Sequence, residues 1–215
     1  MCKEDSVNLK NIKGLKYPDS YFIRFFFKNG LQNKRLKYLE FGCGNGNNLM
    51  LPFEYGNEVI GVDINEERIK EAKFNIKGEF FCEDMREFVR KREFKVNVIS
   101  LPNIINYICK KDFEEFLKNL KKFYDRGFLF IRFRSYRDFR YGRGEDLGRG
   151  CYKTLDDLTS EKGAINCFYN EVEMVDLLRE YLNLKNYYLF HVDFENLAKD
   201  KVILNSDIVI WGEIE

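Results

Sequence analysis

Short apolar runs alternate along the chain with longer segments that carry a single apolar face. Runs typical of buried strands occur at 36–41, 58–63, 79–82, 96–100, 128–131, 187–194 and 206–213. Each of the first four runs is followed by a segment with helical periodicity. Strands that alternate with helices predict an α/β fold with a largely parallel sheet.

Capping residues and periodicity predict the helices. Asp19 precedes an apolar face rich in phenylalanine and Gly30 follows it, so a helix is expected between them. Further helices are expected at 47–54, 65–76, 85–91, 112–124 and 170–182. Only about a dozen residues separate the last two strands, which is too few for a helical crossover, so these strands should pair antiparallel.

The first strand ends in a turn with glycine at alternate positions, Gly42-Cys43-Gly44-Asn45-Gly46. Glycine permits a sharp turn and leaves no Cβ between the backbone and a ligand, and the next helix would offer free N–H groups. The third glycine comes one residue too early for the G-x-G-x-x-G nicotinamide pattern, because Asn47 occupies that position. Asp63, at the end of the next strand, is placed to bind ribose hydroxyls.

Three stretches in this order and spacing resemble class I S-adenosylmethionine-dependent methyltransferases. They are Glu40-Phe41-Gly42-Cys43-Gly44-Asn45-Gly46, Gly61-Val62-Asp63-Ile64 and Cys82-Glu83-Asp84-Met85. The resemblance implies a three-layer αβα sandwich whose seven-stranded, mostly parallel sheet has the order 3-2-1-4-5-7-6 and an antiparallel last strand. It also implies S-adenosyl-L-methionine as the cofactor. We expect one methyltransferase domain over 1–215, with 1–16 as an N-terminal extension and 135–168 as an insertion on the acceptor side.

The resemblance assigns cofactor contacts to residues near the ends of the first strands and, for the methionine end of the cofactor, to Tyr17 and Arg24 at the helix before the first strand. These candidates are Tyr17, Arg24, Glu40, Gly42, Gly44, Gly46, Asp63, Ile64, Asp84, Met85 and Leu101. Asp63 would accept both ribose hydroxyls and Asp84 the adenine amino group, while Ile64 and Leu101 would sandwich the adenine ring. Glu40 would orient the amino group of the methionine part. Strand-end capping is the alternative for the two aspartates, and a structural role is the alternative for Glu40. An exposed helix arginine is the alternative for Arg24.

The acceptor is harder to derive, because methyl transfer depends mainly on alignment and needs a base only when the acceptor must lose a proton. Residues 100–103 read Ser-Leu-Pro-Asn and depart from the D/N-P-P-Y/F pattern of methyltransferases that act on amino groups. Asn106 and Tyr107 stand where small-molecule relatives often carry a histidine before an aromatic residue. They are the catalytic candidates, with core packing as the alternative for Tyr107, and no general base is evident.

Arginine is concentrated after the fifth strand. Residues 132–149 contain six arginines against three acidic residues. The planar guanidinium suits carboxylate and phosphate groups, so Arg134 and Arg137 are the candidate substrate-binding residues for a small anionic acceptor. A solvated loop with internal ion pairs is the alternative.

Composition narrows the remaining function classes. The chain has 215 residues, 45% hydrophobic and 33% charged, which is typical of a globular domain. A net charge of +1 gives no argument for DNA binding, and no apolar run approaches the length of a membrane span. The six cysteines form no C-x-x-C pair, so we expect reduced thiols in a cytoplasmic protein. His191, the only histidine, is expected to be a structural strand residue, and no metal site is predicted.

The sequence therefore predicts a cytoplasmic S-adenosylmethionine-dependent methyltransferase that acts on a small anionic molecule, without a DNA or membrane partner. An RNA or protein methyltransferase, or a non-catalytic regulatory module that binds S-adenosylmethionine, are the alternatives. The identity of the acceptor and the oligomeric state do not follow from the sequence.

Overall fold

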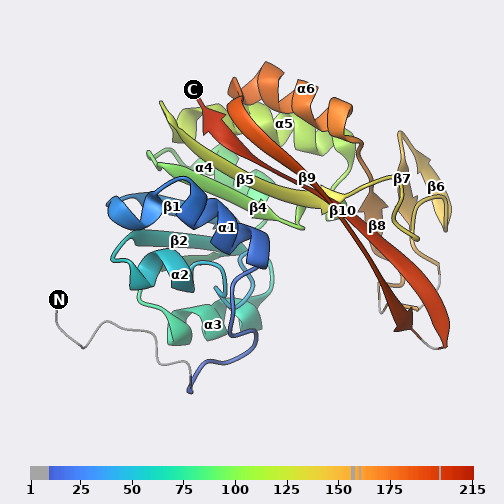
Figure 1. The fold of residues 1–215 in the computed structure, drawn as a ribbon, viewed down its shortest axis with the longest axis horizontal. Helices are drawn as coiled ribbons and strands as arrows, with labels where there is room; N and C mark the ends of the chain where they lie inside the picture. Colours follow the sequence, from blue (N-terminus) through green and yellow to red (C-terminus); the bar gives the residue numbers. More distant parts are fainter. Residues whose placement is uncertain (1–9, 156–157, 160, 199) are drawn as a thin grey trace. The chain divides into compact units, whose positions relative to one another are not determined.

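The computed structural model describes residues 10–155, 158–159, 161–198 and 200–215 (Figure 1). The expected N-terminal extension, 1–16, lies outside the described residues up to residue 9. The chain divides into two compact units: a first unit of residues up to Pro102 with Lys122–Phe130, and a second unit of Asn103–Lys121 with Ile131–Glu215.

The first unit contains alternating strands and helices. Its strands are β1 (Lys37–Phe41), β2 (Glu58–Asp63), β3 (Glu79–Cys82) and β4 (Val98–Pro102). Its helices are α1 (Ser20–Lys28), η2 (Leu31–Asn33), α2 (Met50–Glu54), α3 (Glu66–Asn75) and α4 (Met85–Lys91). β1 pairs in parallel with β2 and with β4, and β2 pairs in parallel with β3. The carboxyl ends of these strands therefore lie at one edge of the sheet.

Local capping confirms most of the expected helix boundaries in this unit. The Asp19 side chain accepts hydrogen bonds from the N–H groups of Tyr21 and Phe22, and Asn65 caps α3 in the same way. Gly30 follows α1 in the left-handed conformation, with φ at 63°. The expectation that α2 starts at Asn47 is wrong, because α2 begins only at Met50 and the asparagines before it bond elsewhere.

The second unit combines two helices, a long hairpin and a small sheet. Its elements are η3 (Ile105–Tyr107), α5 (Lys110–Leu120), β6 (Glu145–Gly148), β7 (Cys151–Lys153), β8 (Ile165–Cys167), α6 (Glu171–Leu182), β9 (Lys185–Ala198) and β10 (Lys201–Ile214). Two further elements, η4 (Lys121–Phe123) and β5 (Gly127–Arg134), each include residues of both units. α5 and α6 lie side by side (Figure 1).

Two boundaries in this unit differ from expectation. α5 begins at Lys110 after Cys109, two residues before the expected capping position at Asp112, and its last turn tightens into η4. The final strands pair antiparallel as expected, but each has 14 residues, because residues 194–198 and 201–205 continue the ladder instead of belonging to a long connection. Val202 lies opposite Leu197, for example, in the part expected to be a loop.

The expected insertion, 135–168, contains the three-stranded antiparallel sheet β6-β7-β8. Cys151 on β7 lies directly opposite Cys167 on β8, and the two form a disulfide. The expectation of six reduced thiols is therefore wrong for this pair, because strand register rather than sequence spacing brings the two sulfurs together. Cys43, Cys82 and Cys109 are free thiols, and Cys2 lies outside the described residues.

The main sheet has seven strands in the order β3-β2-β1-β4-β5-β10-β9. With β9 and β10 as the sixth and seventh strands, this is the expected order 3-2-1-4-5-7-6, so the expected fold class is confirmed. Among the helices in the described ranges, none is long and apolar enough to cross a bilayer.

Candidate functional site

The glycine turn after β1 is built so that one side of its backbone is open. Gly42, Gly44 and Gly46 all have positive φ, at 68°, 52° and 81°. A Cβ on Gly46 would lie 2.9 Å from the Ile76 side chain, whereas a Cβ on Gly44 would meet no atom within 4 Å. The absence of a side chain at Gly46 therefore allows close packing against Ile76. At Gly44 it leaves the backbone open to a ligand.

Asp63 is held directly beside this open face. One of its carboxylate oxygens accepts a hydrogen bond from the Gly44 N–H at 2.9 Å, and the other accepts from the Asn65 N–H at 2.9 Å. Each carboxylate oxygen has a second lone pair, so the fixed side chain can still accept hydroxyl groups. These acceptor oxygens thus fit the hydroxyl groups of the ribose of a nucleoside cofactor.

Glu40 is a buried carboxylate, with 1% of its surface exposed. Its Oε2 accepts hydrogen bonds from Ser100 Oγ at 2.8 Å and from Asn48 Nδ2 at 3.1 Å. Burial raises the pKa of Glu40 to about 8, and the negative charges of Asp19 and Asp63 add to the effect. No lysine or arginine in the described part of the chain pairs with this carboxylate. A cationic ligand group, such as the amino group of S-adenosylmethionine, would therefore suit it.

Three asparagines bind residues 13–19, which we call the strap, to the glycine turn through hydrogen bonds. Asn45 donates to the carbonyls of Lys13 and Leu15 at 2.6 and 2.7 Å, and Asn47 donates to the Tyr17 carbonyl at 3.0 Å. Asn48 accepts from the Asp19 N–H at 2.8 Å. Sequence reasoning missed this strap; the available signal was three asparagines within four residues at a strand–helix junction.

The strap carries one of the residues expected near the methionine end of the cofactor. Tyr17 is exposed on it, and Arg24 is exposed on α1. Their proposed contacts stay predictions.

The adenine candidates are placed less favourably. Asp84 caps α4 by accepting from the Arg86 N–H at 2.8 Å, and both of its oxygens also bind the Arg86 guanidinium, at 2.9 and 2.7 Å. Ile64 is largely exposed, Met85 is buried and Leu101 is completely buried within β4. Capping therefore accounts for the position of Asp84, and the adenine contacts stay predictions.

The catalytic candidates Asn106 and Tyr107 belong to the second unit. Asn106 is fully buried; its Oδ1 accepts from the Arg134 N–H at 2.9 Å and its Nδ2 donates to the Asn103 carbonyl at 3.2 Å. Tyr107 Oη donates to Glu161 Oε1 at 2.8 Å. Burial raises the pKa of Tyr107, so its phenol is a poor base. Both side chains hold the turn in place, and neither offers a general base.

The arginine-rich segment is largely neutralised by acidic residues, most of which lie outside 132–149. The ion pairs are Arg132–Asp207, Arg134–Glu161, Arg137–Asp193, Arg140–Asp138 and Arg149–Glu114. Arg140 also binds Glu161, at 2.5 Å. Burial raises the pKa of Glu161, but the two arginines outweigh it and lower the pKa to about 2. The local excess of positive charge expected from the sequence is therefore not a free anion site.

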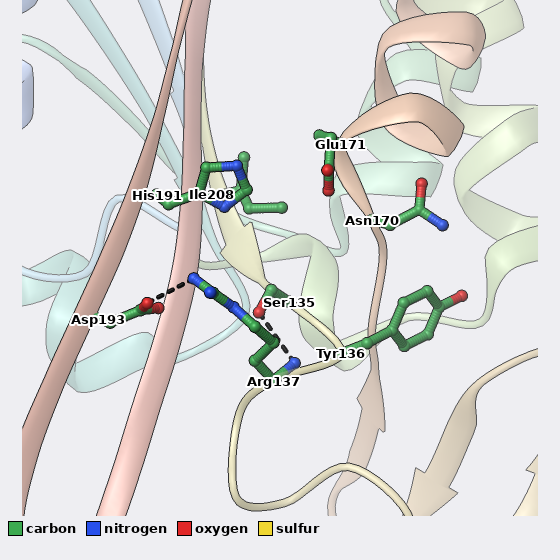
Figure 2. A pocket seen from close by; sticks show the side chains of 8 residues that line it. All are labelled: Ser135, Tyr136, Arg137, Asn170, Glu171, His191, Asp193 and Ile208. Atoms are coloured by element: carbon green, nitrogen blue, oxygen red, sulfur yellow. Dashed lines mark hydrogen bonds and ion pairs between the residues drawn. The ribbon is translucent and has the colours of Figure 1, made fainter.

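A pocket of about 620 Å³ lies in the second unit (Figure 2). Its lining includes Tyr136, Arg137, Asn170, Glu171, His191 and Asp193. His191, expected to be a structural strand residue, has an exposed side chain there, and no residue of the described ranges forms a hydrogen bond with it. Sequence reasoning found Arg137 but missed the other lining residues, which come from separate elements and share no motif.

Comparisons with known proteins match the part of the chain that contains the glycine turn. Residues 39–127, which include the glycine turn, Asp63 and Asp84, match the family model described as a methyltransferase domain. No curated protein sequence matches the chain.

Solved structures share the fold at low sequence identity. A SAM-dependent methyltransferase from Methanosarcina mazei is 20% identical, with a TM-score of 0.64 over 83% of this chain and 92% of that one. A SAM-dependent methyltransferase from Archaeoglobus fulgidus is 16% identical, with a TM-score of 0.62 over 90% and 92%. Magnesium protoporphyrin IX methyltransferase from Synechocystis, solved with bound SAM, is 14% identical, with a TM-score of 0.55 over 89% and 76%. Residues 39–127 therefore match a methyltransferase domain, and the fold of the chain is shared with S-adenosylmethionine-dependent methyltransferases of known structure, one of them solved with bound SAM.

Proposed function

We propose that the protein is an S-adenosylmethionine-dependent methyltransferase that methylates a small molecule with an anionic group, and that Arg137 binds this group. The observation that carries the proposal is the exposed ion pair of Arg137 with Asp193, which lies at the pocket of about 620 Å³. The Arg137 side chain is 57% exposed and that of Asp193 38%. Exposed ion pairs contribute only about 0–1 kcal/mol, so an acceptor carboxylate or phosphate can replace Asp193 at little cost.

Arg134, the other candidate for binding the acceptor, has a different environment. Its side chain is 12% exposed, and it binds Glu161, Asn166 and the Tyr107 hydroxyl. Breaking a buried pair of this kind costs about 3–5 kcal/mol. We therefore assign Arg134 the role of holding the turn of Asn106 and Tyr107 against β5, from where it acts on the acceptor only indirectly.

The first unit would hold the cofactor, which supplies a methyl group activated by the sulfonium. In this proposal the open face of Gly44 lies against the cofactor, Asp63 binds the ribose hydroxyls and Glu40 binds the amino group. Asp84 would reach the adenine amino group only with the oxygen lone pairs that Arg86 leaves available. We also propose that both units act as one methyltransferase domain, because the order of the seven strands includes strands of both.

Arg137→Ala tests the acceptor proposal. In assays that follow transfer of a labelled methyl group to a low-molecular-mass extract, and then to the purified acceptor, kcat/KM should fall by about tenfold or more, because a charge-assisted hydrogen bond is lost. The Kd of S-adenosylhomocysteine should stay within about twofold. Arg137→Lys should restore only part of the activity, since lysine restores the charge but not the planar fork.

Arg149→Ala is the matched control. Arg149 also forms an exposed ion pair, with Glu114, and its side chain is 62% exposed, but it does not line the pocket. Its loss should leave kcat/KM unchanged. Equal activity of the Arg137 and Arg149 variants would contradict the proposal, as would label that enters RNA or protein instead of the small molecules.

A further inference from the structure

Two polar side chains of the pocket have no partner within the described part of the chain. They are the carboxylate of Glu171, at the start of α6, and the imidazole of His191, on β9. Figure 2 shows both among the side chains that line the cavity. Neighbouring charged groups of this unit form ion pairs, namely Lys110–Glu173, Arg132–Asp207 and Arg134–Glu161, whereas these two groups are available to a ligand.

The wall formed by β9, β10 and the residues after β5 is held by a chain of hydrogen bonds. The Arg137 N–H donates to Ser135 Oγ at 3.0 Å, the hydroxyls of Ser135 and Ser206 are 2.6 Å apart, and Ser206 Oγ donates to Asp193 at 2.6 Å. Asp193 in turn binds the Arg137 guanidinium. This network fixes the position of the guanidinium without using all of its donors.

The opposite wall, formed by Tyr136 and the residues at the start of α6, is also held by hydrogen bonds. Asn170 caps α6 through its Oδ1, which accepts from the Glu173 N–H at 2.8 Å, so its side-chain NH₂ group remains as a donor. Tyr136 Oη accepts from Lys110 at 2.9 Å and donates to Glu173 at 3.0 Å. The tyrosine ring is thereby held in place beside the residues at the start of α6.

The charge balance of the pocket favours a ligand that also carries a positive charge over a simple anion. Arg137 carries one formal positive charge, and Asp193 and Glu171 each carry one formal negative charge. A ligand with only a carboxylate would bind Arg137 but would not use Glu171. A ligand that also carries an ammonium group can pair with Glu171 on one wall and with Arg137 on the other.

We propose that this pocket binds a zwitterion of the α-amino acid class, with its ammonium group on Glu171 and its carboxylate on Arg137, where His191 and Asn170 offer further hydrogen bonds. The inference rests on the proposed function in one respect: the carboxylate of this zwitterion is the anionic group of the acceptor. A cavity of about 620 Å³ has room for a large amino acid side chain next to Tyr136 and Ile208.

Binding can be measured without cofactor and without turnover. The full chain is titrated calorimetrically with the standard α-amino acids, and each one that binds is compared with its N-acetyl derivative, which lacks the ammonium group, and its amide, which lacks the carboxylate. Both derivatives should bind at least about tenfold more weakly than the parent, because each loses one charged contact. Glu171→Gln should weaken binding of the parent by a similar factor but leave the N-acetyl derivative within about twofold.

Asp176→Asn is the matched control, since Asp176 is an exposed acid on the same helix that does not line the pocket. It should not change the Kd. If no amino acid binds, or if an N-acetyl derivative binds as well as its parent, the zwitterion proposal is overturned, even if the enzyme methylates another anion. Conversely, binding of an amino acid without any methyl transfer to it would overturn only its assignment as the acceptor.

Discussion

Two glutamates show how the surroundings of a side chain decide its role in this protein. Burial without a cation raises the pKa of Glu40 to about 8, whereas Arg134 and Arg140 lower the pKa of Glu161 to about 2 although burial acts in the opposite direction. Glu161 is thus a satisfied structural anion that holds arginines in place. Glu40 has no cation beside it and stays protonated up to about pH 8, and a bound cation would stabilise its ionised form.

The raised pKa of Glu40 predicts how stability depends on pH. Between the usual value of 4.5 and about 8, the folded protein retains a proton that the unfolded chain has released. The free energy of unfolding should therefore fall by about 1.4 kcal/mol per pH unit across this window because of this group. Glu40→Gln keeps the shape and remains neutral, so its curve should lack this slope.

Urea denaturation of the cofactor-free protein at several values from pH 5 to 8.5 measures this effect. The two proteins should have similar stability at pH 5, and the variant should be the more stable one at pH 8. Parallel curves would contradict the raised pKa of Glu40. In the same window, binding of S-adenosylhomocysteine to the wild type should release protons, which calorimetry in buffers of different ionisation enthalpy detects.

At the scale of elements, the disulfide between β7 and β8 fixes the sheet that the inserted segment forms. Cys151 and Cys167 are 16 residues apart. Closing a loop of this length stabilises a folded protein by about 3 kcal/mol in the chain-entropy view. The small sheet leads directly into Asn170 and Glu171 at the start of α6, so it also supports one wall of the pocket.

A reductant should therefore lower the stability of the wild type by about 2–4 kcal/mol in urea denaturation. The double variant Cys151→Ser/Cys167→Ser should show this loss already in oxidising buffer and should not respond to reductant. Cys109→Ser, which removes a free thiol of the same unit, serves as the control and should retain the full response. A wild type that does not respond would mean that the two cysteines are reduced.

At the scale of the whole molecule, the functional candidates are divided between the two units. All candidate cofactor contacts belong to the first unit, and the residues of the pocket belong to the second. Variants of one unit should therefore affect one ligand and leave the binding of the other largely unchanged.

S-adenosylhomocysteine at about 100 times its Kd should stabilise the protein by about 2.7 kcal/mol, which corresponds to about 5–10 °C in Tm for a chain of this size. Asp63→Ala should weaken binding by at least about tenfold and reduce the shift, because the hydrogen bonds from the ribose to a charged group are lost. Arg137→Ala should show the full shift. The absence of any shift in the wild type, measured by scanning fluorimetry, would contradict the cofactor assignment.

The sequence by itself determined the local structure and the cofactor motif. Asp19, Asn65 and Asn170 cap helices through hydrogen bonds to N–H groups two or three residues away, and the helix 85–91 occurs at the expected residues. Glycine at positive φ and an acidic residue at the end of β2 are likewise properties of short segments. Such features can be read from the sequence because the residues that interact are neighbours along the chain.

Only the tertiary structure decided which charged groups are available. Arg132 is neutralised by a residue 75 positions away and Arg137 by one 56 positions away, so the positive excess within 132–149 gave a misleading picture of the surface. The strap on the glycine turn, the disulfide and the pocket around Glu171 arise in the same way. Ion pairs, cross-links and cavities depend on distance in space, and the fold alone brings together residues that lie far apart along the chain.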